Sequence, residues 1–182
     1  MRKIFFIKAL IVLTFTTSYN ELFAQADIDP IAKAIAERDS IFYSNLGKPY
    51  LSFSIQSLAN DVFTEQSLKG KVTLINFWFT GCAPCIAEFG DLNRLYHKYK
   101  NNPNVQLISI TKDDTELALK TAQKYQLAYP VCPVELKECY RLNLHSGFPT
   151  NIVVDKTGKI VYLNLGSSFE KDRIEKFFIE AE

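Results

Sequence analysis

The stretch from Phe77 to Cys85 reads FWFTGCAPC, and it decides the fold. An apolar run ends in a turn, and the turn leads to Cys82 and Cys85, which are separated by two residues and followed by a helical pattern. We interpret the stretch as a buried strand that delivers a dithiol to the first turn of a helix. The rest of the chain is expected to support this dithiol or to present a substrate to it.

The segments around the dithiol predict an α/β domain. Residues 72–79 are almost all β-branched, aromatic or Leu, which indicates an interior strand covered on both faces. A helix of about four turns is expected after Cys85, followed by a second interior strand over 105–110, and this order makes a right-handed parallel unit. Two further strands, 151–154 and 160–165, are expected to form a hairpin.

Other patterns complete the predicted order of elements. Alternating apolar residues predict a strand over 51–58, and Asp113 with Glu116 resembles a capping box that opens a further helix. An extended segment over 129–133 and a short helix over 135–142 are expected next. The fold class is therefore α/β, with a mixed central sheet and helices on both faces.

The first 26 residues have the features of a secretory signal peptide. Basic residues stand at the start, a short apolar run follows, and Ala24-Gln25-Ala26 places small residues at alternate positions. A retained membrane anchor is the alternative, but 11 residues separate Lys8 from Asn20, whereas a spanning helix needs about 20. We therefore predict export with cleavage before Asp27.

Composition narrows the class of protein further. The chain has 182 residues, so 182 − 26 = 156 would remain after cleavage, which is enough for one compact core. The formal net charge is +1, and no long acidic or basic block is present. Nothing in this composition indicates binding to nucleic acid.

The predicted position of Cys82 points to redox chemistry. Unpaired backbone N–H groups at a helix N-terminus favour an anion, so the pKa of Cys82 is expected to fall from about 8.5 toward the range of about 3.5–7.5. Cys82 would then be the nucleophile that attacks a disulfide, and Cys85 would release the mixed disulfide by attacking Cys82. Pro84 suits the first turn, where a missing N–H costs nothing.

Three other interpretations of the dithiol remain open at this point. A structural disulfide is one, although a loop of two residues cross-links little chain. A copper- or zinc-binding delivery module that uses the dithiol with His145 is another; a closed zinc site would need two more ligands. The nearby candidate ligands are Cys132, Cys139, His97 and His145. A non-catalytic interaction domain is the third.

Several motifs together resemble a known family. Phe77-Trp78, the Cys82–Cys85 motif, Glu88 and the stretch Gly147-Phe148-Pro149-Thr150 resemble the thioredoxin superfamily. The signal peptide, and the Glu three residues after the second Cys, are similar to those of TlpA/ResA-like periplasmic thiol-disulfide oxidoreductases. The resemblance covers about 49–182. It implies a thioredoxin-like domain over 49–182. Before this domain, Asp29-Pro30 resembles an N-cap followed by a proline in the first turn of a helix, so a helical extension is expected over 27–48, behind the signal peptide over 1–26.

The resemblance also implies roles for individual residues. In such proteins the proline at the position of Pro149 is cis and faces the dithiol, which exposes the backbone of Phe148 to an extended substrate. Glu88 would exchange a proton with Cys85. An ordinary trans proline and a Glu88 that reaches solvent are the alternatives. The expected catalytic residues are Cys82, Cys85, Glu88 and Pro149, and the expected substrate-binding residues are Gly81, Ala83, Pro84, Phe148 and Thr150.

Two features depart from the pattern of the family. Relatives often carry a bulkier residue before the first Cys, whereas this chain has Gly81, which leaves the nucleophile more open. Cys132 and Cys139 are additional cysteines. A second disulfide between them, two free thiols and a redox relay are all considered.

The leading hypothesis is an exported protein-disulfide reductase of the cytochrome c maturation type. The resemblance implies a membrane thiol-electron transporter as electron donor and an oxidised protein, such as an apocytochrome c, as substrate. It also implies location in the periplasm, no cofactor and no nucleic-acid partner.

Overall fold

The structure is a computed structural model that describes residues 29–166 and 169–181. The chain divides into two compact units between Arg38 and Asp39, and each unit is described by itself. The predicted signal peptide over 1–26 lies outside the described residues. Within the described part, no helix has the length and apolar character needed to span a membrane.

Helix α2 (Pro30–Tyr43) begins in the first unit and ends in the second. The Asp29 carboxylate accepts a hydrogen bond from the Ile31 amide at 3.0 Å, so Asp29 caps the start of the helix. In the second unit, Phe42 is fully buried in an apolar cluster with Tyr50 and Phe53. The last turn of α2 is thereby fixed to the core of the second unit.

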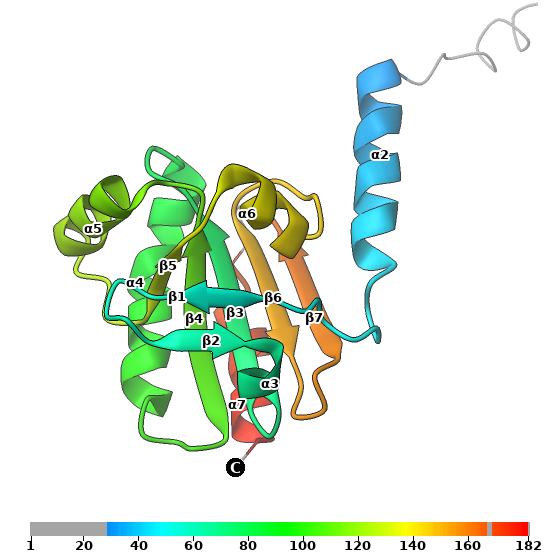
Figure 1. The fold of residues 1–182 in the computed structure, drawn as a ribbon. Helices are drawn as coiled ribbons and strands as arrows, with labels where there is room; N and C mark the ends of the chain where they lie inside the picture. Colours follow the sequence, from blue (N-terminus) through cyan, green and yellow to red (C-terminus); the bar gives the residue numbers. More distant parts are fainter. Residues whose placement is uncertain (1–28, 167–168, 182) are drawn as a thin grey trace, which may run out of the picture. The chain divides into compact units, whose positions relative to one another are not determined.

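The second unit is built on a five-stranded sheet with the order β5-β4-β3-β6-β7 (Figure 1). Three neighbouring strands, β5, β4 and β3, are parallel; β6 is antiparallel to β3, and β7 is antiparallel to β6. The predicted mixed sheet is therefore confirmed. The strand bounds are β3 (Val72–Trp78), β4 (Val105–Thr111), β5 (Val131–Pro133), β6 (Thr150–Val154) and β7 (Ile160–Leu165).

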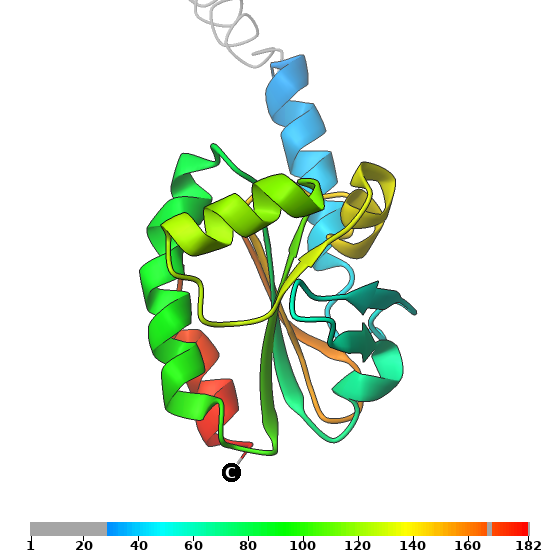
Figure 2. The same ribbon diagram turned by 60° about the vertical axis from the view of Figure 1, so that its left-hand side comes forward.

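Helices cover both faces of this sheet, as predicted (Figure 2). One face packs against α4 (Ala83–Tyr99) and α7 (Lys171–Ile179), and α5 (Thr115–Lys124) joins the same apolar cluster through Ala118. The other face packs against α3 (Glu65–Leu68) and α6 (Leu136–Leu142). The β3–α4–β4 unit is parallel, so the N-terminus of α4 lies at the carboxyl edge of the sheet.

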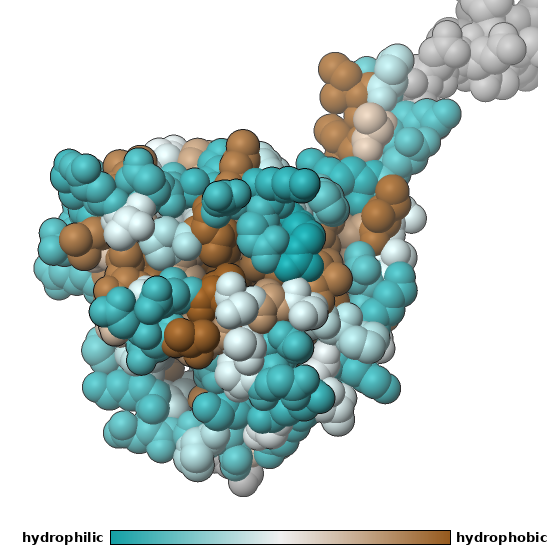
Figure 3. Space-filling view, in the orientation of Figure 1, coloured by the Kyte–Doolittle hydropathy of each residue, from teal (hydrophilic) through white to brown (hydrophobic). Residues whose placement is uncertain are grey.

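A small hairpin adds to the second face. The predicted strand over 51–58 is shorter than expected, because only β1 (Ser54–Gln56) pairs, and its partner β2 (Val62–Thr64) was not predicted. The expected alternation is present, since Phe53 and Ile55 are buried. Val62 of β2 is exposed. In the view of Figure 3, hydrophobic residues form small groups on a surface that is mostly hydrophilic.

Strand β3 distributes its side chains between the two layers. Leu74 and Trp78 join the cluster beneath α4, whereas Ile75 and Phe77 join the cluster on the opposite face. All seven residues of the strand are buried, as expected for an interior strand. Asn76 lies on the α4 face, and it is the one side-chain amide within β3.

The predicted capping box at Asp113 is wrong by one residue. Asp114 is the N-cap of α5, and its carboxylate accepts a hydrogen bond from the Leu117 amide at 2.8 Å. Asp113 is therefore not needed by the helix and contacts the turn that precedes the dithiol.

Candidate active site

The dithiol lies at the beginning of α4, as the sequence predicts. Cys82 is the N-cap residue, and its sulfur accepts a hydrogen bond from the Cys85 amide at 3.3 Å. The two cysteines form a disulfide, with Cα atoms 5.3 Å apart. Cys85 is fully buried and Cys82 is 5% exposed. Pro84 occupies the first turn of the helix, where it is half-buried beside the exposed Ala83.

The turn before Cys82 explains why this chain has glycine there. Gly81 has φ +83°, a left-handed conformation that disfavours residues with a side chain. A Cβ atom at this position would meet nothing within 4 Å, so space does not exclude a larger residue. The backbone of the turn, and not close packing, favours glycine.

Asp113, in the loop between β4 and α5, fixes this turn. Its carboxylate accepts hydrogen bonds from the Thr80 amide and the Thr80 hydroxyl, both at 2.7 Å. The Thr80 hydroxyl also lies 2.7 Å from the Thr121 hydroxyl of α5. The turn that carries Cys82 is thus tied to the loop after β4 and to α5, an arrangement that sequence reasoning missed.

Glu88 is buried one turn after Cys85. Its Oε2 atom accepts hydrogen bonds from the side-chain amides of Asn76, at 3.3 Å, and Asn151, at 3.0 Å. Only 2% of the residue is exposed, and this burial raises the pKa of the carboxyl to about 7 although both amides act to lower it. Glu88 is therefore a buried carboxyl, and the alternative in which it reaches solvent is excluded.

The loop before β6 brings its aromatic residue to the redox turn. The Phe148–Pro149 bond is cis, as the resemblance implied, and Pro149 is buried. The Phe148 ring packs edge-on against Phe79, with centroids 5.3 Å apart. The Lys112 ammonium lies 4.2 Å from the Phe79 centroid and 5.4 Å from that of Phe148. A half-buried pair of rings therefore joins the proline loop to the end of β3.

Comparison with known proteins agrees with this geometry. The model of the AhpC/TSA family matches residues 46–163. The chain is 32% identical over 133 residues to a thiol-disulfide oxidoreductase ResA of Bacillus cereus, covering 72% of this chain and 76% of the relative. The chain belongs to the thioredoxin-like thiol-disulfide oxidoreductases.

Two solved structures extend the similarity. The thioredoxin domain of a thiol-disulfide oxidoreductase from Bacteroides vulgatus matches with a TM-score of 0.64 and 25% identity, covering 72% of this chain and 96% of that one. A thiol:disulfide interchange protein from Bacteroides sp. matches with a TM-score of 0.62 and 26% identity, covering 72% and 89%. The thioredoxin-like fold implied by the sequence motifs is therefore confirmed.

In this oxidoreductase, the Thr150 side chain faces the interior of the proline loop. Its hydroxyl donates to the Gly147 carbonyl at 2.6 Å and lies 2.7 Å from the Ser146 hydroxyl. The residue is fully buried. Its side chain thus stabilises the loop from within, whereas the sequence placed Thr150 among the residues that meet the substrate.

The second pair of cysteines in the oxidoreductase is not oxidised. Cys132 and Cys139 are both free and buried, so the hypothesis of a second disulfide is wrong and that of two free thiols is confirmed. Burial raises the pKa of each thiol to about 12. Over the described ranges, no group of three or more His, Cys, Asp or Glu residues could hold a metal ion, and His145 is exposed. The metal-delivery hypothesis is therefore not favoured.

Two residues of the site were missed although the sequence carried a signal for them. Asn76 and Asn151 stand inside strands that are otherwise mostly apolar, and they are cross-strand partners in the sheet. A buried amide in a strand needs a polar partner, which identifies such positions as candidates for a polar site. The pairing itself could not be seen before the strand register was known.

Proposed function

We propose that the protein is an exported thiol-disulfide oxidoreductase that reduces disulfides in other proteins. The observation that carries this proposal is the position of Cys82 at the N-terminus of α4, joined to the buried Cys85. The N-terminus of a helix stabilises a thiolate, and a thiolate is the attacking species in disulfide exchange. Membership of the oxidoreductase family supports the same chemistry.

The reaction proceeds in two exchange steps. In the reduced protein, the Cys82 thiolate attacks one sulfur of the substrate disulfide, which breaks that bond, forms a mixed disulfide and releases a substrate thiolate that takes up a proton. The Cys85 thiol then loses its proton and attacks Cys82. This second step releases the other substrate thiol and leaves the Cys82–Cys85 disulfide, so that two electrons pass to the substrate.

Glu88 is proposed as the group that takes the proton from Cys85. The two residues are three positions apart on α4, so they lie on the same face of the helix. A carboxyl whose pKa is about 7 changes protonation near neutral pH, which suits a group that must both accept and release a proton.

The substrate is proposed to lie across the turn and the proline loop. The exposed Gly81 and Ala83, with the half-buried Pro84, flank Cys82 in the chain, and the Phe148 ring of the proline loop packs against Phe79, just before the turn. The backbone of Phe148 would pair with an extended substrate segment. Thr150 supports this site by holding the loop.

The cellular setting belongs to the same proposal. We propose a periplasmic protein. Its signal peptide would be residues 1–26, its extension residues 27–48 and its thioredoxin-like domain residues 49–182. A reductant in an oxidising compartment needs electrons from elsewhere, and we assign this role to a membrane thiol-electron transporter. An apocytochrome c is the proposed substrate, which corresponds to a function in cytochrome c maturation.

The reduction potential of the Cys82–Cys85 couple tests the direction of transfer. A reductant is expected to have a potential near or below that of thioredoxin, about −270 mV, whereas a potential near that of the oxidant DsbA, about −120 mV, would overturn the proposal of a reductant. A Cys85→Ser variant should accumulate mixed disulfides with exported proteins. The matched Cys82→Ser variant should accumulate none, and capture of the same proteins by both variants would contradict the assigned order of attack.

A further inference from the structure

A row of buried side-chain amides crosses the sheet beneath α4. Asn76 of β3 pairs in register with Asn151 of β6, and Asn151 pairs with Asn164 of β7. All three residues are less than one-tenth exposed. Burying a polar side chain in this layer costs free energy unless the side chain forms hydrogen bonds. We therefore ask which hydrogen bonds these amides make and what those bonds do at the site.

The two oxygens of the Glu88 carboxyl differ sharply in their surroundings. Oε2 accepts hydrogen bonds from the Nδ2 atoms of Asn76 and Asn151. Oε1 is buried and has no hydrogen-bond partner among the described residues. A proton placed on Oε2 would compete with two amide donors, whereas a proton on Oε1 would displace nothing.

We propose that Asn76 and Asn151 are positioning residues that keep Oε2 of Glu88 as a fixed acceptor and confine its exchangeable proton to Oε1. The inference rests on the proposed proton exchange between Glu88 and Cys85. It adds the atom at which the proton is held and the residues that determine this choice.

The hydrogen bonds between the two amides support this assignment. Asn76 donates from Nδ2 to Oδ1 of Asn151 at 2.9 Å, in addition to its bond with Glu88. Because Oδ1 of Asn151 is occupied by this contact, its Nδ2 is directed to the carboxylate. Each amide thus orients the other, and both present donors to the same oxygen.

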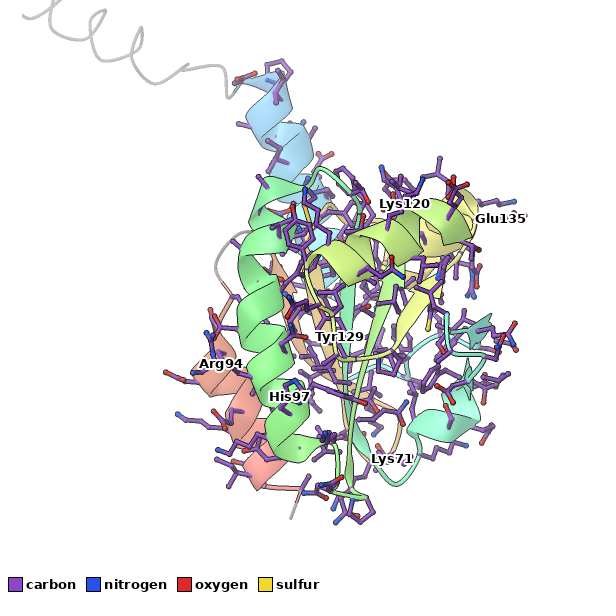
Figure 4. All side chains as sticks on the ribbon, turned by 90° about the vertical axis from the view of Figure 1, so that its left-hand side faces the viewer. Lys71, Arg94, His97, Lys120, Tyr129 and Glu135 are labelled. Carbon is purple, nitrogen blue, oxygen red and sulfur yellow. A yellow bond between two sulfur atoms is a disulfide. The ribbon has the colours of Figure 1, made fainter. Side chains whose placement is uncertain are left out.

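Among the described residues, Asp91 and Tyr129 are ionisable groups that interact with the charge of Glu88. Asp91, on the next turn of α4, raises the pKa of Glu88 through its negative charge. Tyr129 lies in the segment before β5 and points toward α4 (Figure 4). Its ring packs against Tyr96 of α4, with centroids 6.4 Å apart. Its pKa is raised by burial and by the charge of Glu88, so it stays neutral near pH 7. The strands contribute the neutral amides of Asn76 and Asn151.

The experiment measures the titration of the Glu88 carboxyl carbon by NMR in the full chain, in the oxidised state and without substrate. Asn151→Leu and Asn76→Leu each remove a donor while nearly keeping the side-chain volume. Each is expected to move the titration midpoint of Glu88 upward by about one pH unit or more, because a hydrogen bond to a charged group is worth about 1.5–3 kcal/mol. Asn151→Ser serves as a second variant if Asn151→Leu does not fold.

The matched control is Asn164→Leu, which changes the same residue type in the same row but touches neither oxygen of Glu88. Its midpoint should stay within about 0.3 units of the wild type, far below the shift expected from a lost bond. Unchanged midpoints in the Asn76 and Asn151 variants, or an equal shift in the control, would overturn the inference.

The pH profile of disulfide reduction separates this inference from the proposed function. If the NMR midpoint and the pH profile move together, both are supported. If the midpoint moves and the profile does not, Asn76 and Asn151 position Glu88 as inferred, but Glu88 does not serve Cys85 during turnover.

Discussion

Two pairs of cysteines in one domain have opposite chemical character. Cys82 and Cys85 form a disulfide at the N-terminus of α4, whereas Cys132 of β5 and Cys139 of α6 are free thiols in the apolar cluster on the other face of the sheet. Burial does not separate the pairs, because Cys85, Cys132 and Cys139 are all fully buried and Cys82 is nearly so.

The difference lies in what surrounds each sulfur. Cys82 meets the open end of a helix and the amide of Cys85, and the turn before it is held by Asp113. Cys132 and Cys139 are surrounded mainly by apolar side chains, which raise the pKa of each to about 12. A cysteine in this fold is therefore made reactive by its backbone environment and not by its exposure.

The largest expected effect is on activity. Cys82→Ser should lower the turnover of protein-disulfide reduction at least about a thousandfold, because a serine hydroxyl is not ionised near pH 7 and cannot form the mixed disulfide. Cys132→Ala should stay within about twofold of the wild type, since that thiol takes no part in the exchange. A folded Cys132→Ala protein that lost activity would break the comparison between the pairs.

The second-largest expected effect is on the rate at which iodoacetamide alkylates each cysteine of the reduced, folded protein at pH 7. Cys82 should react at least about a hundredfold faster than Cys132 or Cys139, because a thiol with a pKa of about 12 is almost entirely protonated at pH 7. In urea all four cysteines should react at similar rates. Similar rates in the folded protein would show that the helix terminus gives Cys82 no advantage.

The buried carboxyl beside the first pair should make stability depend on pH. The pKa of Glu88 is raised from 4.5 to about 7, so the folded protein holds a proton there that the unfolded chain loses above pH 4.5. The free energy of unfolding therefore falls as pH rises from 4.5 to 7, by roughly 3 kcal/mol. Glu88→Gln should remove this loss, so its stability relative to the wild type should increase across the same interval.

Urea unfolding of the oxidised proteins at pH 4 and pH 8 measures this difference. Glu116→Gln is the control, because Glu116 is exposed on α5 and pairs only with Lys120 at the surface. Equal pH dependence for wild type and Glu88→Gln would contradict the raised pKa.

The smallest expected effect concerns the turn that places Cys82. Gly81→Ala should destabilise the protein by about 1 kcal/mol, because Gly81 has a positive φ that alanine disfavours. Gly90→Ala, within α4, should instead be neutral or stabilising by up to about 1 kcal/mol, since a Cβ there meets only Arg94 at 3.6 Å. Thermal unfolding measures the stability of both variants. An equal loss of stability in both would contradict the claim that the turn requires glycine at position 81.

Much of the fold could be predicted from local patterns. Three predicted elements are present: the strand over 72–79, the helix after Cys85 and the strand over 105–110. Each was predictable because its pattern involves only residues that are close together in the chain. Strand β2 was not predicted because Val62–Thr64 is short and becomes a strand only by pairing with β1. The helix start at Asp114 instead of Asp113 depends on the bonds between Asp113 and Thr80, 33 residues away.

The candidate site, like the fold, was predictable where a local motif determines it and not where a long-range contact does. The dithiol, Glu88 and the cis proline were predictable because they stand in recognisable motifs. Asn76 and Asn151 were not, because their role depends on a contact between residues 75 positions apart. The state of Cys132 and Cys139 depends on the apolar packing around them, which no spacing in the sequence records.

The ultraviolet absorbance of the Cys82 thiolate, followed against pH in the reduced protein, tests whether the helix N-terminus stabilises the anion. We expect a titration midpoint between about 3.5 and 7.5, because the unpaired backbone N–H groups at the start of α4 favour the thiolate. A midpoint at or above about 8.5, the value of an ordinary cysteine, would contradict it.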